Sequence, residues 1–175
     1  DYAITDNLTL GAGWSTLENI YDSYAKYNLL RQSINNKNKF LSLTLVQGFA
    51  YNHKDLPILN NFSNRWTYNS QLLIARKFTP EFSLQIAPTY IHSTYANQQD
   101  PKNYFALGFG GRYKVKKHVS LVAEYYHNSN KLRSKDTYGA FALGVNWDVR
   151  YLLLQFQMTN ARTYSEHSYI VNTPK

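Results

Sequence analysis

The sequence contains no cysteine, no long apolar run and few charged residues. Without cysteine it has neither a disulfide framework nor a thiolate metal site. No stretch approaches the roughly 18 apolar residues that a membrane-spanning helix needs, which excludes a helical membrane protein. Only 17% of the residues are charged, and aromatic residues reach 16%, too many for a disordered chain.

What the chain has instead is tyrosine and positive charge. It is 175 residues long, which fits one domain, and contains 16 Tyr, 9 Phe and 3 Trp. This composition favours strands over helices. The net charge of +8 is compatible with nucleic acid, anionic lipid or a small anionic solute, and does not choose among them. The first residue is Asp with no signal-peptide pattern after it, so we expect a mature or internal segment.

Apolar and polar residues alternate along almost the whole chain, and no stretch has a helical period. From position 82, for example, Phe82, Leu84 and Ile86 share one face of an extended chain. The pattern predicts about ten strands, at residues 1–4, 7–15, 19–32, 39–53, 65–78, 82–96, 104–115, 119–129, 138–149 and 151–161. Many exceed the usual five or six residues and match the roughly 9–11 that cross a bilayer at a tilt.

The expected connections alternate in length. Short turns at 6–7, 79–81, 116–118 and near 150 alternate with long polar loops at 53–64, 96–103 and 129–137. Residues 33–38 are long for the first set, and 16–18 are short for the second. Short turns at one end and long loops at the other are typical of outer-membrane barrels, in which closure pairs every backbone group.

We therefore predict an all-β fold, an antiparallel up-and-down transmembrane β-barrel. Residues 1–175 would form a single outer-membrane β-barrel domain that lacks one strand at each end, because bacterial barrels have even strand numbers and both termini inside. The full protein would then have about twelve strands. A soluble lipocalin-like β-barrel that binds a small ligand is the alternative, with its apolar face inward. Small residues beside isolated charges on the polar faces, such as Gly108, Gly110 and Gly144, favour a crowded lumen.

Two sets of candidate residues follow from this topology. Aromatic residues near strand ends would form the interfacial girdles of the barrel: Trp14, Tyr27, Tyr51, Trp66, Tyr68, Tyr90, Tyr104, Tyr125 and Trp147. Charged residues on the polar faces would point into the lumen: Asp22, Lys26, Lys77, Arg112, Lys114, Glu124, Asp148 and Arg150.

The lumen charges have two interpretations. An excess of Lys and Arg lining a low-dielectric channel favours anions. Alternatively, the charges pair across strands and plug a narrow barrel, with Arg112 and Lys114 near the strand of Glu124.

Four stretches resemble a membrane-bound β-barrel family, a domain of unknown function of Bacteroidota-type outer membranes. They are TDNLTLG at 5–11, YDSYAKYNLLRQ at 21–32, QLLIARKF at 71–78 and ALGFGGRYK at 106–114. The resemblance implies an outer-membrane barrel with a cleaved signal peptide and a final strand beyond Lys175. It brings no activity and no catalytic residues.

Other chemistry is weakly indicated. His127 and Ser129 share a strand face, as an outer-membrane lipid acyl hydrolase would require, but no surrounding motif supports them. The histidines are scattered, so no metal site and no cofactor are expected, and the aromatic residues follow the apolar face rather than a nucleic-acid groove. We expect a non-enzymatic outer-membrane protein, either a narrow anion-favouring small-solute channel or a structural subunit of an envelope complex. Its partners would be outer-membrane lipid, other envelope proteins and small anionic solutes.

Overall fold

The computed structural model describes residues 2–15, 19–33, 39–53, 65–94, 101–129, 139–150, 152–161 and Ile170. The described part forms ten β-strands. Their bounds are β1 Tyr2–Ala3, β2 Leu8–Ser15, β3 Ile20–Leu30, β4 Ser42–Asn52, β5 Trp66–Lys77, β6 Phe82–Ser93, β7 Asn103–Lys116, β8 Val119–Asn128, β9 Phe141–Val149 and β10 Leu152–Thr159.

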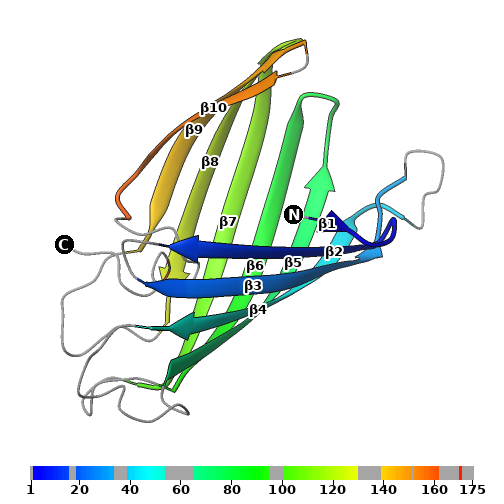
Figure 1. The fold of residues 1–175 in the computed structure, drawn as a ribbon. Coiled ribbons are helices and arrows are strands. Elements are labelled where there is room, and N and C mark those ends of the chain that lie inside the picture. The colour runs from blue at the N-terminus through cyan, green and yellow to red at the C-terminus, as the bar shows by residue number, and fades with distance from the viewer. Residues whose placement is uncertain are drawn as a thin grey trace.

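The strands form one antiparallel sheet in chain order, from β1 to β10. The sheet curves strongly, so that β2 and β3 pass in front of the middle strands (Figure 1). The predicted all-β, up-and-down arrangement of ten strands is therefore confirmed. β1 and β10 are the two edges, and no pairing joins them in the described residues, so the sheet is not closed. The count of about twelve strands stays a prediction.

Local hydrogen bonds explain two of the short connections. Thr5 Oγ1 accepts from Leu8 N at 3.0 Å, and Thr79 Oγ1 accepts from Phe82 N at 3.1 Å, so a threonine hydroxyl closes each turn. Arg150, between β9 and β10, reverses the chain with a φ of 52°. We call the end of the strands that carries the connections β1–β2, β3–β4, β5–β6, β7–β8 and β9–β10 the short-turn end. The opposite end of the strands is the long-loop end. Most of the expected long loops at 53–64, 96–103 and 129–137 lie outside the described residues.

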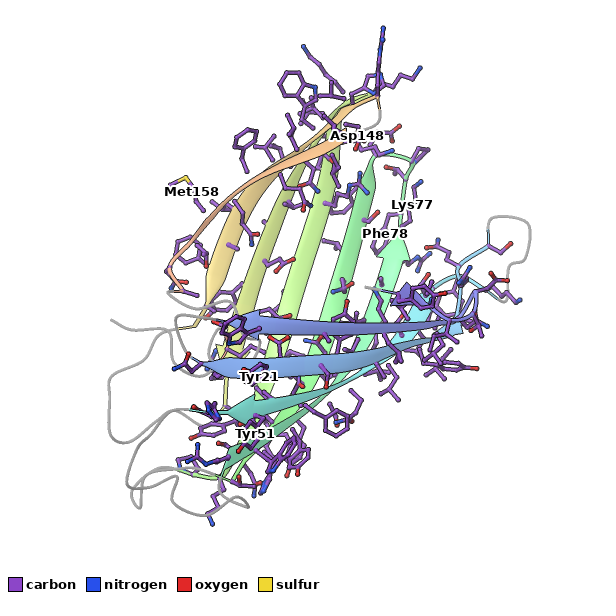
Figure 2. The ribbon with its side chains drawn as sticks, in the orientation of Figure 1. Tyr21, Tyr51, Lys77, Phe78, Asp148 and Met158 are labelled. Atoms are coloured by element: carbon purple, nitrogen blue, oxygen red, sulfur yellow. The ribbon has the colours of Figure 1, made fainter. Side chains whose placement is uncertain are left out.

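The pairing register fixes which side chains share a face, because directly opposed residues point to the same side. On β6, Leu84 and Ile86 are 43% and 44% exposed, whereas Ala87, Thr89 and Ile91 on the other face are buried. The same division continues across the sheet, with Leu107 and Leu143 exposed on the first face. We call this first face the outer face and the other the inner face. On β10, Met158 projects away from the sheet (Figure 2).

This division is the reverse of the arrangement in a soluble barrel. A soluble barrel gathers its apolar row into a dry interior, which offsets the conformational entropy lost on folding. Here the inner face instead buries polar side chains, among them Thr44, Thr67, Asn69, Gln71 and Thr89. An exposed apolar face is stable only against another apolar medium or a partner.

Tyr126 of β8 organises the middle of the inner face. Its hydroxyl accepts a hydrogen bond from Gln71 Nε2 on β5 at 3.2 Å, so the side chain crosses the two intervening strands. The ring lies over Gly108 of β7, where an added Cβ would approach Tyr126 Cε1 to 2.5 Å. The glycine therefore provides the space for the tyrosine.

We expect Gly108→Ala to destabilise the folded sheet by about 1–3 kcal/mol, the usual range for overpacking. The added methyl group would displace the Tyr126 ring and break its bond to Gln71. Gly110→Ala on the same strand and face is the control, because its Cβ would meet nothing closer than Gln85 Cβ at 3.7 Å. Urea unfolding in lipid vesicles measures both. Equal stability of Gly108→Ala and wild type, or a loss that persists in a Tyr126→Ala background, contradicts this interpretation.

Candidate functional site: the inner face and its charged end

Hydrogen bonds between uncharged polar side chains join β3 to β4 and β5 to β6 on the inner face. Gln71 Nε2 also donates to Thr89 Oγ1 at 2.9 Å, and Thr44 Oγ1 donates to Asn28 Oδ1 at 2.9 Å. These bonds join neighbouring strands and satisfy side chains that are largely withdrawn from water. The inner face around Gln71 and Thr89 can therefore meet polar solutes through uncharged groups.

The predicted lumen charges lie on the inner face by register, apart from Arg150, which lies in the turn after β9. Lys77 of β5, Arg112 and Lys114 of β7, Asp148 of β9 and Arg150 are at the short-turn end. Figure 2 labels Lys77 and Asp148 near this end. The others lie further along the strands: Asp22 and Lys26 on β3 and Glu124 on β8.

None of these charged groups forms an ion pair with a described residue. The suggested pairing of Arg112 and Lys114 with Glu124 is therefore wrong. The register puts Gly110 opposite Glu124, and Arg112 instead donates from Nε to Ser120 Oγ at 3.2 Å. Of the predicted lumen charges at the short-turn end, four are cationic and one, that of Asp148, is a carboxylate.

An aromatic belt follows the outer face at the long-loop end. Trp14 stacks on Tyr21 with ring centroids 5.9 Å apart, and Tyr51 meets Trp66 at 5.0 Å. Further contacts continue the belt across the sheet: Phe49 with Tyr68 at 5.7 Å, Tyr68 with His92 at 6.4 Å and Tyr90 with Phe105 at 5.0 Å. Amphipathic rings in such a row suit the boundary between hydrocarbon and water.

The predicted girdle residues divide between the two ends and the two faces. Trp14, Tyr51, Trp66, Tyr68, Tyr90 and Tyr125 lie on the outer face toward the long-loop end, and Tyr27 and Trp147 lie on it toward the short-turn end. The sequence did not indicate Tyr21, Phe49 or Phe105 as girdle residues. Only the strand register, which the sequence does not give, shows that they are paired with predicted girdle residues.

Tyr104 was predicted as a girdle residue, and the structure corrects this prediction. It is 3% exposed, opposite Ile91 on the inner face, and packs with Ile91, Ala106 and Ile170. Because side chains alternate along a strand, Phe105 on the outer face requires its neighbour Tyr104 to point inward. The side-chain amide of Asn128 donates to the backbone oxygen of Ile170, which fixes that residue against the cluster. This cluster fills part of the inner face toward the long-loop end.

The hydrolase candidates show no catalytic arrangement. His127 is on the outer face of β8, opposite Leu107, and Ser129 follows the strand, its backbone N bonded to Phe105 O at 2.9 Å. No hydrogen bond joins their side chains in the described residues. Within the same ranges, no group of His, Asp and Glu could hold a metal ion, and no helix is long and apolar enough to span a bilayer.

An antiparallel meander with an apolar outer face, a polar inner face and interfacial aromatic residues is the class of sheet that crosses membranes. The chain belongs to the family described as membrane bound beta barrel domain (DUF5777), whose family model matches residues 1–175. The predicted resemblance to a membrane-bound β-barrel family is thereby confirmed. Comparison with curated proteins and with solved structures finds no match.

Proposed function

We propose that this protein is a non-enzymatic outer-membrane β-barrel that conducts small anions. The observation that supports the proposal is the set of inner-face cations at the short-turn end, Lys77, Arg112 and Lys114, which form no ion pair with a described carboxylate. Cations held in a channel with low-dielectric walls lower the energy of an entering anion. Unpaired charges are also tolerated more easily in a water-filled bore than in a packed interior.

The rest of the inner face supports a narrow pathway. Conduction needs sites that bind the ion weakly enough for it to leave, and the uncharged hydrogen-bonded side chains of Gln71 and Thr89 provide such surroundings. Toward the long-loop end, the buried cluster around Ile91 and Tyr104 reduces the space within the curved sheet. We therefore expect a small conductance rather than that of an open porin.

The outer membrane of a Bacteroidota-type bacterium is the proposed location. Strand-built spanning domains require a closed sheet, and in bacteria such barrels belong to the outer membrane. The surrounding lipid is then the partner of the outer face, and the pathway needs no cofactor.

The test uses the full-length protein in planar lipid bilayers, after heat-modifiable migration on a denaturing gel has shown that it is folded. Under a KCl gradient we expect small single-channel currents whose reversal potential lies toward the chloride equilibrium potential. No current at any voltage, or a preference for potassium, contradicts the proposal.

A structural subunit of an envelope complex is the second candidate. Ser70 Oγ donates to Gln47 Oε1 at 2.5 Å on the outer face, where polar groups are unusual against lipid. A protein partner over β4 and β5 would explain the pair. Co-purification of a stoichiometric partner in mild detergent is the expected result, and a monodisperse monomer counts against it.

A further inference from the structure

Arg76 is a cation on the outer face of the sheet, opposite to the face of the proposed solute pathway. It is opposite Leu84 of β6, so its side chain is on the apolar outer face near the end of β5. The guanidinium carbon lies 5.0 Å from the Phe78 ring centroid and 5.6 Å from that of Phe40. No described residue forms an ion pair with it. Its two cation–π contacts hold the guanidinium in place and leave its charge unneutralised.

The position of Arg76 matches the boundary of the bilayer. Phe40 and Phe78 are 52% and 53% exposed, at the short-turn end of the outer face. An arginine on the lipid face is costly at the midplane, but at the boundary its long stem can carry the charge to the lipid headgroups. Phosphate is the anion available there, and guanidinium binds it through paired N–H donors.

A hollow in the outer face begins next to this cation. Phe78 packs on Phe82 with centroids 6.0 Å apart, and Phe82 lines a hollow of about 570 Å³. Gly111 and Ala123, paired directly on neighbouring strands, form its floor because their side chains are small. The surrounding residues are larger and apolar: Tyr113, Leu121, Leu143, Phe156 and Met158.

The pairing register shows how the two features are related. Arg76 is opposite Leu84, and Leu84 is opposite Gly111, so the floor of the hollow is two strands, or about 10 Å, from the arginine backbone. A second outer hollow, over Ala12 and Ala25 on β2 and β3, has no charged residue among the described residues that line it. The combination of a cation and an apolar hollow is what distinguishes the first.

We propose that this surface binds one anionic phospholipid molecule. The Arg76 guanidinium binds the phosphate between Phe40 and Phe78, and an acyl chain lies in the hollow over Gly111 and Ala123. The site belongs to the leaflet on the short-turn side. It depends on the family's membrane location and on the outward register, and not on the proposed anion pathway.

The test measures binding of dioleoyl phosphatidylglycerol to delipidated full-length protein in detergent, by native mass spectrometry. Two partial ligands separate the contributions: dioleoylglycerol has the chains without the phosphate, and glycerol phosphate has the phosphate without the chains. We expect the whole lipid to bind at least about tenfold more tightly than either, because each half supplies only part of the contact.

Substitutions at each half of the site should weaken this binding. Arg76→Gln removes the charge and Ala123→Phe fills the hollow, and each should lower the affinity by about tenfold. Arg76→Lys should restore part of the loss. The matched controls are Lys117→Gln, which removes a charge from the β7–β8 turn, and Ala12→Phe, which fills the other hollow. Both should bind lipid as the wild type does.

Three results overturn the proposal: equal affinity for dioleoylglycerol, equal affinity for glycerol phosphate, or a loss in the controls as large as in the site variants. Heat-modifiable migration of every variant separates lost binding from lost folding. A channel without anion preference would leave this result unaffected, so the two proposals fail independently.

Discussion

Replacing the three inner cations at the short-turn end by glutamate, as Lys77→Glu, Arg112→Glu and Lys114→Glu together, should change an anion preference into a cation preference. The three residues share the inner face of β5 and β7, and no described carboxylate pairs with them. The substitution therefore inverts the sign of the potential at the entrance rather than removing ion pairs. We expect the reversal potential under a KCl gradient to change sign in planar bilayers.

The control is Lys117→Glu, which makes the same charge change in the turn after β7. It should alter the reversal potential only slightly, because exposed charges beyond the walls of the pathway are screened within about 8 Å at physiological salt. If the triple variant keeps the wild-type reversal potential while conductance persists, the current does not pass these residues.

Phe109→Arg should be among the most destabilising single substitutions in this sheet, whereas Gly110→Arg should be tolerated. The two residues are adjacent in β7 and therefore at the same depth on opposite faces. Phe109 is 46% exposed on the outer face, where arginine at the bilayer midplane costs about 2–4 kcal/mol. Gly110 faces inward, and an added Cβ there would meet only Gln85 Cβ at 3.7 Å, so a long side chain can start from this position without a clash.

Urea unfolding in lipid vesicles compares these two variants with wild type. The difference in unfolding free energy between the two variants measures the effect of the face alone, because they share the strand, the depth and the introduced residue. A Gly110→Arg variant as unstable as Phe109→Arg would mean that both faces of β7 are closed to water. That result would also count against a water-filled pathway on the inner side.

The strands could be predicted from the sequence because two independent signals agree. Side-chain alternation with period two marks the strand interiors, and polar turn residues such as Thr79 and Pro80 mark their ends. For β8, for instance, the expected 119–129 compares with Val119–Asn128. Closure could not be predicted in the same way, because it depends on pairing between the first and last strands, which no local pattern encodes.

The faces of the charged residues follow from alternation alone, and the register puts Lys77, Arg112 and Glu124 on the inner face. Their partners did not follow, because pairing across strands depends on register, and a shift of two residues separates Arg112 from Glu124. Tyr104 was assigned by residue type rather than by parity. Arg76 was missed because alternation in β5 is weak, and only its pairing with Leu84 shows that it points outward.

The alternation of apolar and polar residues along most of the strands also determines how such a protein can reach its membrane. Mean hydropathy over the chain is −0.50, and most strands alternate apolar with polar residues. The apolar outer face forms only after neighbouring strands have paired, since each strand alone is half polar. Entry into the lipid and acquisition of the native topology must consequently occur as one coupled event, and a strand that arrives unpaired has no stable place in the hydrocarbon.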